Sequence, residues 1–403
     1  MEENKAKVVV KNLYKIFGPN PERAFPLMEQ GKEKDEIHKE LGLTIGVKDA
    51  CFEVYDGEIF VVMGLSGSGK STLVRMLNRL IDPTSGHVFL EGRDIAEMSK
   101  EELTQIRRDK MSMVFQSFAL MPHLTVLRNV AYGLEVAGKP EKERKDRAMK
   151  ALEQVGLEAN ANSYPKELSG GMQQRVGLAR GLAVDPAIML MDEAFSALDP
   201  LIRTEMQDEL LKLQEESQRT IVFISHDLDE AMRIGDRIAM MEGGNIVQVG
   251  TPEAILKNPA NEYVKAFFRG VDPTNVLYAK DIASSRFVTL VAHRSRGLRS
   301  ALEQILRAER DYGFVLDKHH CFQGIVSIDS LKALINADVD EKTPLSRAFL
   351  ENVETITTTT HLQDAVPMIS GAPWPVPVVD ENHVYKGAIS KNIFLDTLHR
   401  GND

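Results

Sequence analysis

The sequence predicts an α/β domain followed by a smaller domain that contains a duplicated βαββα-like unit. Three observations predict this organisation. From Ser71 to about Val249, short apolar runs of buried-strand length alternate with helical segments. A glycine-rich pattern stands where one of these strands passes into a helix. Beyond about residue 279, two segments repeat the order helix, strand, turn, strand and helix.

The composition is that of a folded protein without a broad nucleic-acid surface. The chain has 403 residues, of which 43% are hydrophobic and 27% charged, so two or three cores are expected. A formal net charge of -10 makes nucleic acid an unexpected partner. The two cysteines, Cys51 and Cys321, fit a reducing cytoplasm rather than a disulfide framework. The sequence shows no signal peptide and no apolar run of roughly 18 residues. If the protein works at a membrane, we therefore expect another subunit to span it.

The N-terminal region predicts strands that are interrupted by an insertion. Lys7 to Phe17 alternates like an edge strand, and Val47 to Asp56 and Glu58 to Met63 predict two further strands. Between them, residues 19–46 hold GPNPERAF and then the charged, helix-like PLMEQGKEKDEIHKELG. We therefore expect an insertion here that lies outside the sheet.

The remaining segments complete a first domain at residues 1–269. The runs MSMVF, AIMLMD, TIVFIS and RIAMM predict buried strands. The mixed charges of Lys139 to Lys150 predict the solvated face of a helix. Thr251 to Arg269 has helix-like spacing, and residues 270–278, which include Asp272 and Pro273, predict a linker.

The C-terminal repeat predicts two equivalent halves, residues 279–337 and 338–403. The first contains SALEQILRAERDYGFVLDKHHCFQGIVSIDSLKALI, and the second contains DAVPMISGAPWPVPVVDENHVYKGAISKNIFLDTL. The triplet His319, His320 and Cys321 lacks further ligands at metal-site spacing. We therefore expect it to form a β-turn.

A phosphate-binding loop is predicted at Gly64 to Ser71, which matches G-x-x-x-x-G-K-[ST] between the strand IFVVM and the helix STLVRMLNRL. Its glycines let backbone N–H groups curl around phosphate oxygens at a helix N-terminus. The lysine supplies charge to the outer phosphates, and the serine hydroxyl can ligate Mg²⁺. The expected nucleotide-binding positions are Gly64, Leu65, Ser66, Gly67, Ser68, Gly69, Lys70, Ser71 and the following Thr72.

Two acids follow the predicted strand IMLM. A nucleotide hydrolase needs one acid for the metal and a second group to activate water. Asp192 fits the metal role, and Glu193 is placed to polarise the attacking water. Beside a phosphate-binding loop, this interpretation is favoured over a merely solvated strand end.

Leu168 to Arg175 reads LSGGMQQR and resembles the signature LSGGQxQR of ABC ATPases, with Met172 in place of the first glutamine. Its serine and glycines precede the helix RVGLARGLAV and so form a second anion-accepting helix N-terminus. The expected nucleotide contacts in this segment are Ser169, Gly170, Gly171 and Gln173.

The resemblance to ABC ATPases covers residues 7 to about 250 and implies further site residues. Gln116 matches the family's glutamine for metal and water, and His226 matches its switch histidine at the γ-phosphate. Asp199, in Ser-Ala-Leu-Asp, matches a loop at the nucleotide site. Phe17 stands where the family stacks an aromatic on adenine, with Tyr14 as the alternative. The resemblance implies Mg²⁺ and ATP as ligands, and a second copy of the chain whose signature completes each site.

The C-terminal repeat resembles a tandem pair of CBS domains. In nucleotide-binding CBS units an aspartate holds ribose, but Ser330 and Ile393 occupy the two equivalent positions. This difference favours a role in dimer contacts or ionic regulation over adenosine binding.

The whole chain is similar to ATP-binding subunits of ProU-type glycine betaine/proline betaine importers. That similarity implies an osmoprotectant translocase at the cytoplasmic face of the bacterial inner membrane, a permease partner and, indirectly, a substrate-binding protein. It also implies that residues 117–165 form a helical subdomain facing the permease, with Phe118, Leu120 and Met121 as candidate contacts or subdomain core.

Alternative functions remain open at the level of sequence. The first is uptake of another small solute such as choline, carnitine or an amino acid. A soluble ABC ATPase that acts on DNA or ribosomes is disfavoured, because the chain has neither a second cassette nor a long coiled-coil insertion. A purely regulatory module is disfavoured by the intact Glu193 and His226.

Overall fold

The computed structural model describes residues 5–116, 119–269, 272–291, 297–337 and 343–400. The chain divides into two compact units, Met1–Phe267 and Phe268–Asp403. Within the described residues, no helix combines the length and the apolar character needed to span a membrane.

The first unit contains a four-stranded antiparallel sheet in the order β2-β1-β4-β5. Its strands are β1 (Ala6–Phe17), β2 (Thr44–Tyr55), β4 (Ser85–Leu90) and β5 (Arg93–Asp94). The expectation of an edge strand at Lys7 to Phe17 is wrong, because β1 pairs with β2 on one side and with β4 on the other. Its alternation arises because Val8, Val10 and Leu13 face the core while the other face is more exposed.

A six-stranded sheet in the order β10-β9-β3-β8-β7-β6 forms the centre of the first unit. Its strands are β3 (Ile59–Met63), β6 (Met111–Phe115), β7 (Ile188–Asp192), β8 (Ile221–Ser225), β9 (Arg237–Glu242) and β10 (Asn245–Gly250). All neighbours are parallel except β9 and β10. The short apolar runs are thus confirmed as strands. β3, β7 and β8 are buried along their whole length, as a sheet covered on both faces requires.

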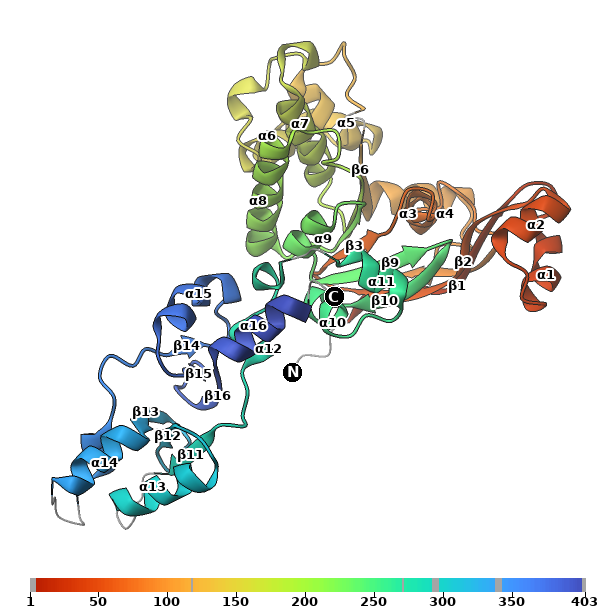
Figure 1. The fold of residues 1–403 in the computed structure, drawn as a ribbon. Coiled ribbons are helices and arrows are strands. Elements are labelled where there is room, and N and C mark those ends of the chain that lie inside the picture. The colour runs from red at the N-terminus through yellow and green to blue at the C-terminus, as the bar shows by residue number, and fades with distance from the viewer. Residues whose placement is uncertain (1–4, 117–118, 270–271, 292–296, 338–342, 401–403) are drawn as a thin grey trace. The chain divides into compact units, whose positions relative to one another are not determined.

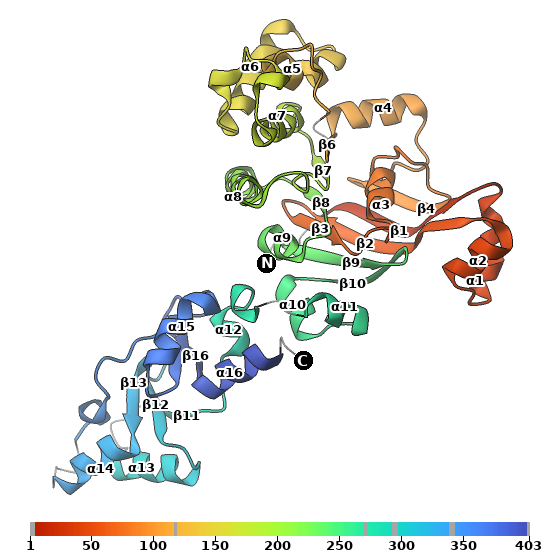
Figure 2. The same ribbon diagram turned by 45° about the horizontal axis from the view of Figure 1, so that its top comes forward.

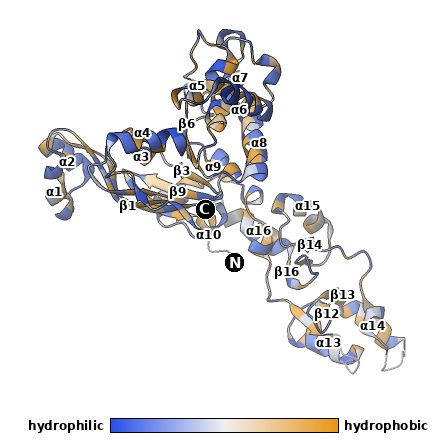
Figure 3. Ribbon diagram, turned by 180° about the vertical axis from the view of Figure 1, so that it is seen from behind, coloured by the Kyte–Doolittle hydropathy of each residue, from blue (hydrophilic) through white to orange (hydrophobic). Residues whose placement is uncertain are grey.

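Helices cover both faces of this parallel sheet (Figure 2). On one face, α3 (Lys70–Leu77) lies between the two sheets, where Leu73 and Val74 join the core that contains Val10 and Val62. The further helices of this unit are α4 (Lys100–Asp109), α8 (Pro200–Ser217), α9 (Leu228–Ile234), α10 (Pro252–Lys257) and α11 (Glu262–Phe267). In Figure 3, hydrophobic colour follows strand β9, whereas α4 is largely hydrophilic.

Residues 19–43 form a small appendage outside the sheet, but residues 44–46 are the first residues of β2, so the expectation that the whole of 19–46 lies outside the sheet is wrong at its end. The appendage contains η1 (Pro21–Ala24), α1 (Phe25–Glu29) and α2 (Lys34–Leu41). Ile37 and Leu43 pack with Ile16 and Ile45 of the flanking strands. The helix-like charged segment is two helices rather than one, because the chain turns at Gly31, whose φ is +81°.

The helical subdomain contains α5 (Val126–Val136), α6 (Glu141–Gln154), η2 (Glu158–Asn160) and η3 (Pro165–Glu167). Of these, α5 and α6 pack against α7 (Gly170–Ala183), which follows in the chain (Figure 1). The charge run at Lys139 to Lys150 lies mainly on α6, which buries only Ala148, Ala151 and Leu152. The prediction of a solvated helix face is therefore confirmed.

The second unit has two three-stranded sheets of the same design. Their strand orders are β11-β12-β13 and β14-β15-β16. In each sheet the first two strands are parallel and the last two are antiparallel. The first half consists of β11 (Val288–Val291), α13 (Leu298–Arg307), β12 (Tyr312–Leu316), β13 (Phe322–Ser327) and α14 (Ile328–Asn336). The second consists of β14 (Ile356–Thr357), α15 (Leu362–Gly371), β15 (Val376–Val379), β16 (Tyr385–Ile389) and α16 (Lys391–Arg400). The duplicated βαββα order is confirmed.

The connections of this unit include η4 (Pro273–Asn275), α12 (Ala279–Ile282) and η5 (Leu345–Ala348). Of the expected linker 270–278, residues 270 and 271 lie outside the described residues. The remainder is packed, with Pro273 and Thr274 buried in the second unit.

The two β-hairpin turns of the second unit are equivalent and touch. Asp317 accepts hydrogen bonds from the backbone of His319 and Cys321, and Asp380 does the same for Asn382 and Val384. Cys321 bridges to Val384 across the two sheets. The triplet at His319 to Cys321 is therefore a turn, as predicted.

Candidate nucleotide site

The predicted phosphate loop turns sharply between β3 and α3. Gly64, Gly67 and Gly69 have φ values of +154°, +78° and +106°, which favour glycine. A Cβ on Gly69 would lie 2.1 Å from the carbonyl oxygen of Gly46, and one on Gly64 would lie 2.1 Å from that of Met241. The tip residues 65–67 are exposed, while Ser68 is buried. The loop therefore presents its tip to a ligand while its base is fixed by backbone packing.

Lys70 lies beneath this loop. Its ammonium donates to the carbonyl oxygens of Gly64 at 2.8 Å and Leu65 at 3.0 Å. Burial lowers the pKa of Lys70, and the nearby carboxylates of Glu193 and Asp192 oppose that shift. An ammonium group held by neutral carbonyls in this position retains a charge to offer to a phosphate.

Ser71, in the first turn of α3, contacts Asp192, the last residue of β7. The Ser71 hydroxyl donates to Asp192 Oδ1 at 2.9 Å, and Arg75 donates to Asp192 Oδ2 at 3.1 Å. Asp192 is only 5% exposed, so both of its carboxylate oxygens need these donors. A hydroxyl beside a carboxylate is an oxygen donor pair of the kind that Mg²⁺ prefers.

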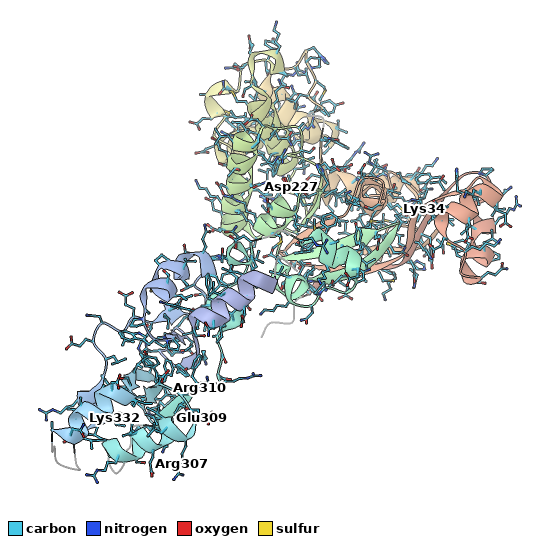
Figure 4. All side chains as sticks on the ribbon, in the orientation of Figure 1. Lys34, Asp227, Arg307, Glu309, Arg310 and Lys332 are labelled. Atoms are coloured by element: carbon cyan, nitrogen blue, oxygen red, sulfur yellow. The ribbon has the colours of Figure 1, made fainter. Side chains whose placement is uncertain are left out.

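Glu193, the residue after Asp192, lies close to His226. Glu193 Oε2 is 3.5 Å from His226 Nδ1. Glu193 has a left-handed backbone with φ +49°, an uncommon conformation for this residue type. Its carbonyl accepts hydrogen bonds from the backbone and the hydroxyl of Ser196, which fixes that turn. Asp227, labelled in Figure 4, caps α9 directly after His226 and pairs with Arg203 at 3.0 Å.

Strand register brings Gln116 to the same edge. Phe115 of β6 pairs with Asp192 of β7, so Gln116 and Glu193 each follow at the same level. Likewise Met63 pairs with Ser225, so Gly64 and His226 follow together. The carboxyl ends of four parallel strands therefore collect Gly64, His226, Glu193 and Gln116 at one edge, where α/β sheets bind ligands.

The signature segment caps a different helix. Ser169 is the N-cap of α7 and accepts from Met172 N at 3.3 Å, and Gln173 donates to the carbonyl of Leu168. Ser169 and Gly170 are exposed. Among the hydrogen bonds and ion pairs of the described residues, none joins residues 168–175 to the phosphate loop. Asp199 caps α8 by accepting from Ile202 N at 3.1 Å.

Phe17 lies near the start of α3. Its ring is so close to Gly46 that a Cβ there would be 2.7 Å from the ring and 3.4 Å from Thr72. Phe17 is 39% exposed. The alternative, Tyr14, instead packs edge-on against Phe25 of the appendage at a ring separation of 5.3 Å. Phe17 is the more exposed of the two aromatics, and the Lys15 ammonium lies 5.2 Å from the centre of its ring.

Sequence reasoning did not identify two residues of the site. Arg75, one helical turn after Ser71, pairs with Asp192, and the i, i+4 spacing on α3 is a signal that could have found it. Tyr263 reaches the phosphate loop from α11 with no sequence signal.

A groove of about 580 Å³ lies beside β6 and the helical subdomain. It is lined by both apolar and basic side chains, among them Met121, Tyr132, Val136 and Arg180. Of the candidate permease contacts, Met121 lines this groove, Leu120 is half-buried elsewhere, and Phe118 lies outside the described residues.

Comparison with known proteins places this site in a family. Residues 47–196 match the ABC transporter family model. The chain is 57% identical over 98% of both chains to the glycine betaine/proline betaine transport system ATP-binding protein ProV of Salmonella typhimurium. It is 48% identical to the glycine betaine transport ATP-binding protein OpuAA of Bacillus subtilis, over 100% of this chain and 95% of that protein.

A solved structure shares the fold of the first unit. The dimeric structure of a bacterial ABC transporter cassette has 34% sequence identity and a TM-score of 0.51, and it covers 60% of this chain and 98% of that chain. Together with the end-to-end similarity to the ProV and OpuAA proteins, this match shows that the chain belongs to the ABC transporter family, among its ATP-binding proteins.

Proposed function

We propose that this chain hydrolyses ATP to drive uptake of glycine betaine and proline-type osmoprotectants through a membrane permease. The observation that carries the ATPase is the gathering of Lys70, Ser71, Asp192, Glu193 and His226 along one edge of the parallel sheet. The names of the relatives that align end to end support the substrate.

In this proposal the described residues divide the chemistry of phosphoryl transfer. The loop N–H groups and Lys70 hold the phosphates, and Phe17 stacks on adenine. Glu193 accepts a proton from the attacking water, and His226 contacts the γ-phosphate. The 3.5 Å separation of Glu193 and His226 supports their joint action on one water.

The site fits Mg²⁺ as well as nucleotide. Ser71 and Asp192 offer hydroxyl and carboxylate oxygens at 2.9 Å, and Gln116 follows the neighbouring strand. The buried Ser68 hydroxyl, which has no hydrogen-bond partner among the described residues, is a further free polar atom in the phosphate loop. When bound, Mg²⁺ would neutralise charge on the outer phosphates.

We further propose that each site is completed by a second copy of the chain. The exposed Ser169 and Gly170 at the N-terminus of α7 would contact the γ-phosphate held by the partner's phosphate loop. Asp199 would lie at the same interface. The dimeric cassette with a similar fold supports this arrangement.

The groove beside β6 is our candidate for the permease contact at the cytoplasmic face of the bacterial inner membrane. It adjoins the strand that ends before Gln116, so movement there can reach the site. A substrate-binding protein would act through the permease. Nucleic acid is not expected, since the net charge is -10.

For the second unit we propose a tandem CBS pair that regulates the ATPase. The repeated βαββα order supports this. Ser327 caps α14, and the Ser330 hydroxyl accepts from the Ser327 backbone N–H and donates to the Ser327 carbonyl, so it is already used. This supports regulation by contacts or ionic strength over ribose binding at that position.

ATP-dependent dimerisation tests the shared site. In Glu193→Gln protein, which should trap bound ATP, sedimentation velocity should show ATP converting monomer to dimer, and Ser169→Arg in that background should abolish the conversion. Arg299→Ser, at an exposed position of the second unit, is the control. A dimer that forms equally well with Ser169→Arg would contradict the shared site.

A further inference from the structure

Tyr263 lies in α11, the last helix of the first unit, and its hydroxyl reaches the phosphate loop. It accepts a hydrogen bond from the backbone N–H of Leu65 at 3.3 Å and donates one to the carbonyl of Met241 at 3.2 Å. The residues that it joins are 198 and 22 positions away in the chain. One phenolic oxygen therefore ties the loop to β9 and to α11.

One of these contacts is made to Leu65, which also holds Lys70, and the other is made to Met241, which packs against Gly64. The Lys70 ammonium donates to the carbonyl oxygens of Gly64 and Leu65. The Met241 carbonyl that accepts from Tyr263 is the atom that a Cβ on Gly64 would strike. Packing against Met241 and the hydrogen bond to Tyr263 therefore both restrain the peptide groups that orient Lys70.

The helix that carries Tyr263 is itself well anchored. Val264 is fully buried, and the Tyr263 ring packs at 5.6 Å from the ring of Phe267. Tyr263 is half-buried, and burial raises the pKa of its phenol, so it remains a neutral donor near neutral pH. The hydroxyl can therefore be removed without emptying a core position.

We propose that Tyr263 is a positioning residue that holds the phosphate loop in the conformation that receives ATP. The inference rests on the proposed ATP site. Without the hydroxyl, the Leu65 amide loses its hydrogen bond to α11, and the peptide groups that hold Lys70 are constrained by one contact fewer. ATP binding must then order the loop, which weakens binding without altering the groups that carry out hydrolysis.

The test is steady-state ATPase kinetics of the full-length Tyr263→Phe protein. Loss of one hydrogen-bonding group should raise the KM for ATP about 3- to 10-fold, with kcat within about twofold of wild type. Tyr55→Phe is the matched control, because its hydroxyl bonds to Glu53 at 3.4 Å near the opposite end of β3. It should leave the KM for ATP unchanged.

Two further measurements, of ATP binding by Tyr263→Phe and by Lys70→Ala, distinguish failure of this inference from failure of the proposed ATP site. Equilibrium binding of ATP by Tyr263→Phe should weaken by the same factor as KM, whereas an unchanged KM and affinity with lowered thermal stability would overturn the inference and leave a structural role only. Lys70→Ala tests the site itself. Wild-type ATP affinity in Lys70→Ala would refute the proposed site, whereas loss of affinity there with no effect of Tyr263→Phe would refute only this inference.

Discussion

The Ser71 hydroxyl donates to Asp192 Oδ1 at 2.9 Å, joining the first turn of α3 to the end of β7. The two residues are 121 positions apart in the chain, and their contact links the phosphate loop to the strand that ends at Asp192, directly before Glu193. In the proposed function, this contact sets the position of Glu193, the next residue, relative to a nucleotide held by the loop.

Arg75→Met should lower the free energy of unfolding of the nucleotide-free protein by about 1–3 kcal/mol, because Asp192 would keep a buried, unpaired oxygen. Chemical denaturation measures this. Arg233→Met is the control, since its pair with Asp208 is exposed on both sides and should contribute less than about 1 kcal/mol. Adding Mg²⁺ and ATP should reduce the difference in unfolding free energy between wild type and Arg75→Met, because the metal then neutralises Asp192. Equal losses in the two variants would contradict the role of Arg75.

Gly69→Ala should weaken ATP binding more than tenfold, because the new Cβ would lie 2.1 Å from the Gly46 carbonyl in a left-handed conformation. Gly243→Ala provides the control: its φ is +56°, but nothing lies within 4 Å of the added Cβ. That variant should lose about 1 kcal/mol of stability and keep its ATP affinity. Fluorescence titration with a nucleotide analogue distinguishes the two, and wild-type affinity in Gly69→Ala would refute the steric argument.

Glu230→Gln should change how stability depends on pH. Burial raises the pKa of Glu230, although hydrogen bonds from Ser225 and Gln207 oppose the shift. A raised pKa in the folded state means that the stabilisation is complete below the pKa of the unfolded glutamate and is lost as pH rises through the folded pKa. The difference in unfolding free energy, wild type minus Glu230→Gln, should therefore fall as pH rises.

Denaturation curves across about pH 4 to about pH 8 measure this difference. Glu216→Gln, at an exposed position near the end of α8, controls for the loss of a surface carboxylate. A difference that grows with pH would show that hydrogen bonding, and not burial, controls Glu230.

Much of this site is predictable from sequence because its chemistry depends on short segments. Gly64 to Ser71 fixes its own turn through glycine conformations, and Asp192 and Glu193 follow directly from a buried strand. The predicted order of strands and helices, and the duplication in the second unit, follow from apolar runs of the right length.

What sequence reasoning missed depends on contacts between distant segments. Arg75 meets Asp192 across 117 positions, and Tyr263 meets Leu65 across 198. The interior place of β1 was also missed, because alternation reports one buried face and does not report how many neighbours a strand has. The sequence already favoured Phe17 over Tyr14, and the structure adds that Tyr14 packs against Phe25 of the appendage.

In the proposed function, Glu193 activates the attacking water, and import depends on that hydrolysis. We expect Glu193→Gln to lower ATP hydrolysis by about 10²- to 10⁴-fold while ATP binding is retained, because the attacking water loses its base. Glu216→Gln, far along α8 from the site, should behave as wild type.

Uptake of radiolabelled glycine betaine into vesicles that contain the cognate permease and binding protein tests this claim most directly. We expect ATP-dependent uptake with the wild-type chain and with Glu216→Gln, and at least about 100-fold slower uptake with Glu193→Gln. Unchanged uptake with Glu193→Gln would contradict the catalytic assignment, and no glycine betaine uptake with the wild-type chain would contradict the proposed substrate.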